Sequence, residues 1–289
     1  MGSELRGNLS SPDGTSSRSS YEITPIVEGS IWKVDVRPIL ERAHPDWDNE
    51  MLRVAKAAGQ KSIEGGSVGT SLAPPDFQTV YHPTNGLTIA RELPWALDLY
   101  RNEFRNIVES ITGDPSVHLG EDLAHSLNMN LTLRGPYELH GDRNKWTGMS
   151  SATTMEQGEG GETIFWPESI VSEAPAPSLR SNLTPDILSQ IMRWQELSLI
   201  DRLKVWREFD LWHILHPKNG ESIYKPVAVI RPEAGFLYVF NGRTQLHEVT
   251  AFQPKTPDRV RLTVPGDYYT NDVPEVIDRE FNKLIGVGK

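Results

Sequence analysis

The 289-residue sequence contains no cysteine, which excludes disulfide bonds and metal sites built on thiolates. No apolar run is long enough to span a bilayer, and the first twenty residues lack the apolar segment of a secretory signal. Arg6 stands where a myristoylation pattern requires serine or threonine. These absences predict a cytoplasmic protein that does not associate with membranes.

Clustered basic residues are also missing. The 29 Lys and Arg are outnumbered by 39 Asp and Glu, which gives a formal net charge of −10. Because binding to a nucleic-acid backbone needs grouped positive charge, no nucleic-acid partner is expected. No feature of the sequence specifies an oligomeric state.

The chain divides into three parts by composition. Residues 1–20 are rich in serine and polar residues and predict a disordered tail, and residues 21–126 predict an N-terminal cap of helices and a short strand that packs on a barrel. Residues 127–289 predict the barrel itself. Within the cap, the turn-rich stretch 59–86 predicts a loop bordering the active site.

One long helix is predicted over residues 94–112. Its apolar residues recur at a helical period, which is suited to packing against the outside of a sheet. They are Leu97, Tyr100, Phe104, Ile107 and Ile111.

Seven strands are predicted after residue 126, each bounded by glycine, proline or asparagine. They cover residues 127–133, 151–157, 161–166, 226–230, 236–240, 247–252 and 260–264. A helical insertion at about 167–225 begins a helix with Thr184 as N-cap and Pro185 in its first turn. The large aromatic residues of the insertion, Trp194, Trp206 and Trp212, are interpreted as its own packing core.

A candidate metal site is formed by His140 and Asp142, an HxD pair, together with the distant His247. Side chains at i and i+2 of a strand share one face, so the pair can hold one ion. Two neutral imidazoles and one carboxylate on one face of a metal are typical of non-haem Fe(II) oxygenases. His213 and His216, at i and i+3, lack a matching carboxylate and are not predicted to bind a second metal.

Arg261 and Thr263 form an RxT pair on one face of a later strand. A guanidinium there can hold a carboxylate through two parallel hydrogen bonds, as a keto-acid cosubstrate would require. Arg259 shares this face and is a rival for the role, but Arg261 is favoured because Thr263 completes the pair.

The stretches YELHGD, GEGGETIFWPE and AGFLYVFNGRTQLHEV resemble the 2-oxoglutarate- and Fe(II)-dependent oxygenases over roughly residues 128–269. They look like the prolyl-4-hydroxylase-like branch, and FNGRTQLHEV is also similar to small-molecule hydroxylases and halogenases. The resemblance implies a mainly β double-stranded β-helix, a cupin-like jelly roll with flanking helices. It implies Fe(II), 2-oxoglutarate and O2 as cofactor and cosubstrates, with Tyr137 and Thr163 lining the cosubstrate pocket. Prolyl hydroxylases of this branch commonly use lysine where Arg261 stands, so a prolyl substrate is not carried over.

The leading hypothesis is therefore a dioxygenase that hydroxylates a small molecule, such as an amino acid or a secondary metabolite, and releases succinate and CO2. Candidate substrate contacts are Arg143 and Trp146, which follow the HxD pair, and Arg243, which precedes His247. Two alternatives remain: a protein prolyl or amino-acyl hydroxylase of the same mechanism, and a jelly-roll binding or isomerase module without oxygen chemistry.

Overall fold

Strand β6 (Asn128–His140) organises the fold in this computed structural model. Its first half pairs antiparallel with β12 (Arg261–Tyr269) and β4 (Gln78–Asn85), and its second half pairs with β11 (His247–Phe252). The change of partner occurs at Gly135, whose φ of 93° is a conformation that favours glycine. One strand thus connects two faces of a barrel-like sheet.

The structure describes residues 21–64, 78–142, 144–176, 179 and 184–275. The predicted tail, 1–20, lies outside them. The remaining strands are β1 (Ile23–Val27), β2 (Ile31–Asp35), β3 (Lys61–Glu64), β5 (His118–Leu119), β7 (Trp146–Ser151), β8 (Thr163–Phe165), β9 (Ala228–Ile230) and β10 (Phe236–Asn241). The helices are α1 (Arg37–Ala43), α2 (Trp47–Ala57), α3 (Gly86–Glu92), α4 (Pro94–Leu99), α5 (Arg105–Thr112), α6 (Leu123–Ser126), α7 (Ser169–Ser172), α8 (Pro185–Met192), α9 (Leu199–Glu208) and α10 (Leu211–Leu215), with a π-helical turn at Tyr100–Phe104 and a 3-10 turn at Trp194–Glu196.

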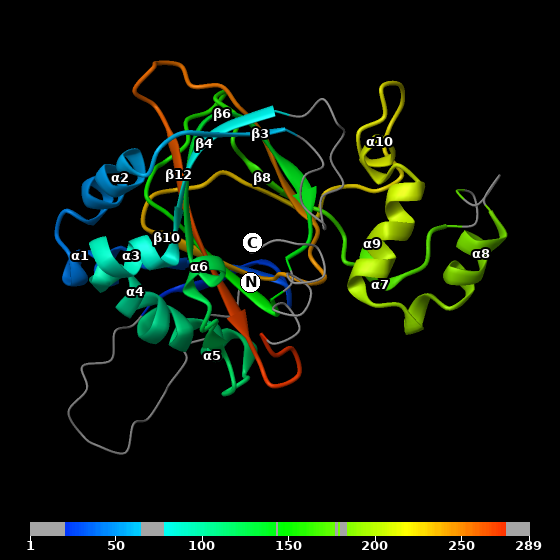
Figure 1. The fold of residues 1–289 in the computed structure, drawn as a ribbon, viewed down its shortest axis with the longest axis horizontal. Coiled ribbons are helices and arrows are strands. Elements are labelled where there is room, and N and C mark those ends of the chain that lie inside the picture. The colour runs from blue at the N-terminus through cyan, green and yellow to red at the C-terminus, as the bar shows by residue number, and fades with distance from the viewer. Residues whose placement is uncertain (1–20, 65–77, 143, 177–178, 180–183, 276–289) are drawn as a thin grey trace, which may run out of the picture.

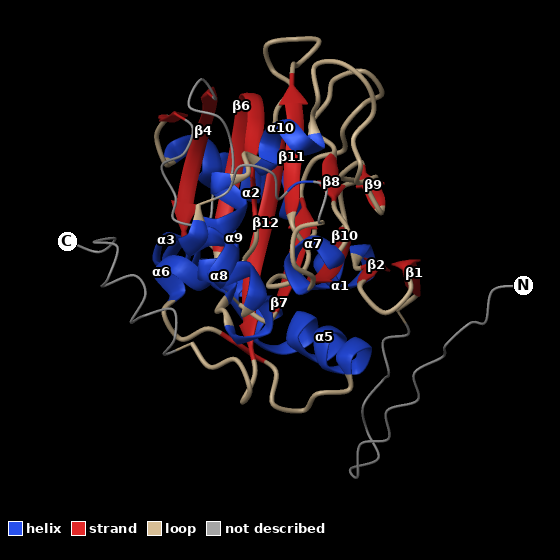
Figure 2. Ribbon diagram, turned by 90° about the vertical axis from the view of Figure 1, so that its right-hand side faces the viewer, coloured by secondary structure: helices blue, strands red, loops and turns tan. Residues whose placement is uncertain are grey.

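The strand order is β1-β2-β10-β7-β12-β6-β11-β8-β9, with β4 beside β6, β3 beside β4 and β5 beside β12. Neighbouring strands that are far apart in the sequence, such as β2 and β10, are the mark of a jelly roll. Figure 2 shows the long strands of the barrel side by side, and Figure 1 shows helices on its outside. The predicted fold class, a mainly β jelly roll with flanking helices, is confirmed.

Helices α1 to α5 cover one side of the barrel (Figure 1). Their buried side chains join those of β2, β6, β10 and β12 in one hydrophobic core. The helix predicted over 94–112 is interrupted by the π-helical turn, yet Tyr100 and Phe104 of that turn are fully buried. The Tyr100 hydroxyl lies 2.8 Å from Ser150 Oγ on β7. No helix among the described residues is long and apolar enough to cross a bilayer.

Two predicted segments were wrong. Within the loop predicted over residues 59–86, residues 61–64 form β3 and residues 78–85 form β4, while residues 65–77 lie outside the described residues. Pro83 is tolerated in β4 because β3 pairs only with Gln78 to Tyr81, which leaves the backbone at Pro83 without a second neighbouring strand among the described residues. The strand predicted at 151–157 is instead β7, six residues long and ending at Ser151. The polar residues of β7 concealed it, since the side-chain hydrogen bonds that allow their burial, between Ser150 and Tyr100 and from Thr147 to Asp142, form only in the folded chain.

The insertion carries helices α7 to α10 beside the barrel (Figure 1). Thr184 caps α8 as predicted, and its Oγ1 accepts from the Ile187 amide at 3.4 Å. Trp194 and Trp206 are buried in a second hydrophobic core, and Trp212 packs on its edge, as predicted. Leu139 and Leu246 of the barrel belong to the same core, so the insertion packs directly on the barrel wall.

Candidate active site

The structure brings His140, Asp142 and His247 together at one end of the barrel. One ligand atom from each lies within 4.8 Å of the others, and no other such group occurs among the described residues. His140 ends β6 and His247 begins β11, and these two residues are paired across the two antiparallel strands. The strand pairing therefore joins two residues separated by more than one hundred positions.

Both histidines present Nε2 to the site. The Nδ1 of His140 lies 2.6 Å from the Glu138 carbonyl oxygen, and the Nδ1 of His247 lies 3.0 Å from the Gln245 carbonyl oxygen. Because a carbonyl only accepts, each Nδ1 carries the proton and each Nε2 keeps a free lone pair. Burial, together with the neighbouring His140, lowers the pKa of His247 to about 4, so its imidazole is neutral at pH 7.

Asp142 reaches the site from a loop. The single-strand argument for the HxD pair is wrong in this detail, because β6 ends at His140. Asp142 is held instead by a 2.8 Å hydrogen bond from its amide to the Gly242 carbonyl. A Cβ at Gly242 would lie 2.8 Å from the Asp142 Cβ, so only glycine allows this close approach.

The three donor atoms fit a divalent metal. Asp142 Oδ1 lies 3.6 Å from His140 Nε2 and 3.9 Å from His247 Nε2, which is too long for direct hydrogen bonds. The groups converge without binding one another, and two neutral imidazoles with one carboxylate suit Fe(II) with open positions left over.

Arg261 lies in the same cavity, which has a volume of about 370 Å³. The guanidinium is buried, donating from Nε to the Gly161 carbonyl (2.9 Å), from Nη1 to Thr263 Oγ1 (3.4 Å) and from Nη2 to Thr163 Oγ1 (3.3 Å). Burial lowers its pKa to about 10, so the charge remains at neutral pH. No carboxylate of the described residues forms an ion pair with it. Tyr137 also lines the cavity, and burial raises the pKa of its phenol, which therefore stays protonated.

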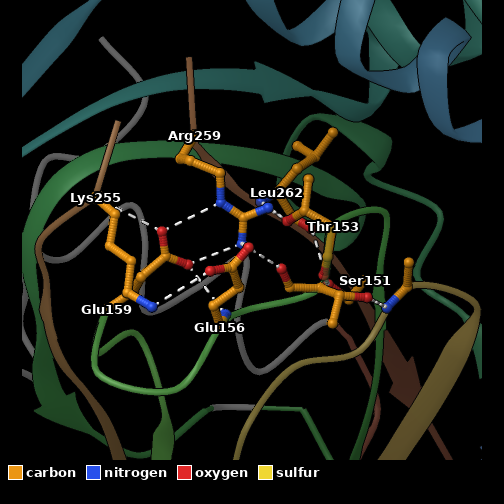
Figure 3. A network of polar contacts seen from close by, with 9 residues as sticks. Ser151, Thr153, Glu156, Glu159, Lys255, Arg259 and Leu262 are labelled. Atoms are coloured by element: carbon orange, nitrogen blue, oxygen red, sulfur yellow. Dashed lines mark hydrogen bonds and ion pairs between the residues drawn. The ribbon is translucent and has the colours of Figure 1, made fainter. Parts of the chain in front are cut away.

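Arg259 is not part of the cavity lining and belongs instead to the polar network drawn in Figure 3. Its Nε and Nη2 donate to the two carboxylate oxygens of Glu159 at 3.1 and 2.8 Å. Glu159 also accepts from the amides of Glu156 and Lys255. This network fixes the loop that leads to Gly161, whose carbonyl holds Arg261. Of the two rival arginines, the structure brings Arg261 to the cavity and pairs Arg259 with Glu159.

Replacing Glu159 with glutamine is expected to destabilise the fold by about 1–3 kcal/mol at pH 7, since it removes a buried charge-assisted acceptor. The Arg259 hydrogen bonds lower the folded-state pKa of Glu159 to about 2, below its ordinary value of 4.5. The stabilisation is therefore present above pH 4.5 and is lost as the pH falls from 4.5 towards 2.

Chemical denaturation of both proteins between pH 7 and pH 3 measures this effect. The stability gap should narrow below pH 4.5, and a gap that stays constant with pH would contradict the assignment. Glu156→Gln is the matched control, because the Glu156 side chain is 54% exposed and its pairing with Lys255 and Arg259 is worth little.

Of the three residues predicted to contact the substrate, the two that the structure describes are not found in the cavity lining. Trp146 packs edge-on against Trp32, with ring centroids 6.0 Å apart, and neither Trp146 nor Arg243 lines the cavity. Arg143 lies outside the described residues. His213 contacts Asp210, and His216 lies 2.9 Å from Glu248, so neither joins a metal-ligand group.

Several cavity residues were missed by the sequence analysis. Among those with polar side chains are Asp122, His125, Ser126, Asn128, Asn130, Thr132, Asn144, Thr147, Asp267 and Glu275. They come from α6, β6, β7 and β12 and, for Asp122, Asn144 and Glu275, from segments outside these elements, and no spacing rule connects them. The one available signal was the position of Asn144 and Thr147, two and five residues after Asp142.

No protein-family model matches the sequence, and no curated protein matches it. Solved structures are similar in fold. The carbocyclase SnoK of nogalamycin biosynthesis, described as non-haem and α-ketoglutarate-dependent, is 15% identical, with a TM-score of 0.49 over 86% of each chain. A prolyl-4-hydroxylase from Pseudomonas putida is 13% identical, with a TM-score of 0.42 over 84% of this chain and 94% of the other. HygX from Streptomyces hygroscopicus, solved with nickel and 2-oxoglutarate, is 13% identical, with a TM-score of 0.36 over 77% of this chain and 87% of the other. These are likenesses of fold alone.

Proposed function

We propose that this protein is an Fe(II)- and 2-oxoglutarate-dependent dioxygenase that hydroxylates a small molecule. One observation carries the proposal: a buried guanidinium without a carboxylate partner among the described residues shares a cavity with a His-Asp-His group. A buried charge is costly unless it is paired, so Arg261 calls for an anionic ligand. A dicarboxylate that also chelates the metal satisfies both requirements at once.

The residues of the chain would bind and orient the metal and the cosubstrate. His140 and His247 would hold iron through Nε2, and Asp142 through Oδ1. Arg261 would bind the far carboxylate of 2-oxoglutarate, with Thr163 and Thr263 fixing the orientation of its guanidinium. When bound, iron and 2-oxoglutarate supply the oxidation, in which one oxygen atom of O2 enters a substrate C–H bond and the other enters succinate as CO2 leaves.

The remaining lining supports a polar small molecule as substrate. A cavity of about 370 Å³ is within the usual range for small-molecule sites. Besides Arg261 its lining includes Asp122, Asn128, Asn130 and Asp267, which are rich in hydrogen-bond acceptors. We therefore propose a substrate that carries hydroxyl or amino groups.

Substrate-stimulated release of succinate tests this function. Iron-loaded protein is expected to release succinate from 2-oxoglutarate faster with a polyhydroxylated or amino-bearing metabolite than with apolar metabolites or proline-containing peptides. His247→Ala, assayed in parallel, reports the background. Stimulation by the peptides alone would favour the protein-hydroxylase alternative, and no succinate above the His247→Ala background would favour a module without oxygen chemistry.

A further inference from the structure

A series of side-chain hydrogen bonds connects Asn144 through Thr147 to Asp142. Thr147 Oγ1 lies 2.5 Å from Asp142 Oδ2, and Asn144 Nδ2 lies 2.9 Å from Thr147 Oγ1 and 2.6 Å from the Trp146 carbonyl oxygen. The other carboxylate oxygen, Oδ1, is the one that faces the two histidines. The two oxygens of Asp142 thus have different neighbours.

The direction of these bonds is fixed by chemistry. The Trp146 carbonyl only accepts, so the Asn144 atom beside it must be the NH2 group, which only donates. The Thr147 hydroxyl therefore accepts from Asn144, and its single proton is left for Asp142 Oδ2. Asn144 and Thr147 are 1% and 2% exposed, so both side chains are buried in the cavity wall.

The backbone around this hydrogen-bonded relay, Asn144 to Thr147 to Asp142, is paired and closely packed. Thr147 lies on β7, which is paired with β10 on one side and β12 on the other. A Cβ at Gly242 would lie 3.0 Å from Thr147 Oγ1 and 3.0 Å from the Asn144 carbonyl oxygen, so the loop is packed closely against both residues. The hydroxyl is therefore presented to Asp142 from a strand that is paired on both sides.

We propose that Thr147, supported by Asn144, is a positioning residue for the metal site: its hydroxyl occupies Oδ2 so that Asp142 presents Oδ1 alone to the metal. Without that hydrogen bond the carboxylate is free to rotate, and the Oδ2 of the partly buried Asp142 loses its hydroxyl donor. The inference rests on the proposed metal site, but it does not depend on the identity of the substrate.

The test is the affinity of the intact protein for Co(II), measured by calorimetry and by the visible spectrum of the bound ion. Thr147→Val keeps the shape and removes the hydroxyl, and it is expected to raise the Kd for Co(II) by about 10- to 100-fold and to change the spectrum. Thr147→Ser restores the hydroxyl and should bind within a few-fold of wild type. Thr84→Val is the matched control, because the Thr84 hydroxyl is buried without a partner among the described residues and far from the relay in the sequence.

Asn144→Ala provides an independent variant if Thr147→Val does not fold. Its Kd should also rise, and in the double variant the two effects should not add, because Asn144 acts through Thr147. Thr147→Val and Asn144→Ala both binding Co(II) as tightly as wild type would overturn the relay and leave the metal site standing. Wild type that fails to bind Co(II) would overturn the metal site itself, and with it the proposed function.

Discussion

Alanine at His140, Asp142 or His247 is expected to abolish succinate formation from 2-oxoglutarate and to weaken Fe(II) binding by more than about 100-fold. Loss of a ligand should weaken metal binding by more than the 10- to 100-fold caused by loss of a residue that only orients a ligand. Each residue supplies one of three donor atoms that converge within 4.8 Å, and none has a neighbour in that group able to replace it.

Anaerobic calorimetry for Fe(II) affinity and a succinate assay with excess iron check this prediction separately. His213→Ala is the matched control, since that side chain is exposed on α10. Its polar contact in the described part of the chain is with Asp210. A folded alanine variant that keeps full turnover with added Fe(II) would remove that residue from the ligand set.

Lysine at Arg261 is expected to raise the KM for 2-oxoglutarate by about 10- to 150-fold, which corresponds to about 1.5–3 kcal/mol for a charge-assisted hydrogen bond. Lysine keeps the charge but loses the planar fork that can bind both oxygens of a carboxylate. It also loses the contacts that fix the guanidinium on the Gly161 carbonyl and the two threonines.

Arg259→Lys separates the cosubstrate role from a general effect of losing an arginine. Arg259 is bonded to Glu159 outside the cavity, so this substitution should lower the melting temperature while leaving the KM for 2-oxoglutarate within a few-fold of wild type. The opposite ranking of the two variants would transfer the carboxylate-binding role to Arg259.

The elements with regular patterns were predictable from the sequence. The apolar stripe from Leu97 to Ile107 identified a buried helical segment, and the runs at 236–240 and 247–252 identified β10 and β11 to within one residue. Local sequence patterns did not predict the elements whose structure depends on partners far away in the sequence. Strand β7 has few apolar residues, and its Ser150 hydroxyl is satisfied by Tyr100, 50 positions away, which no local pattern reveals.

The candidate site was also predictable only in part. Residue types and order suggested His140, Asp142, His247 and Arg261, because each has a distinctive chemical role. The residues that hold these side chains in place could not be predicted from residue type and order. Gly242 matters because Asp142 passes within contact distance of it, and Thr147 matters because its proton points to Oδ2, which are properties of the assembled barrel.

The packing of the helical insertion limits how this barrel can be altered. Leu139 and Leu246, the residues immediately before His140 and His247, are buried by the core shared with α7 to α10. Next to His247, Glu248 accepts from the Trp166 indole at 3.0 Å and lies 2.9 Å from His216 of the insertion. The insertion is thus not a detachable module. Trimming it to obtain a minimal barrel, or exchanging it for that of another protein, would expose the two leucines and leave Glu248 without one of its partners.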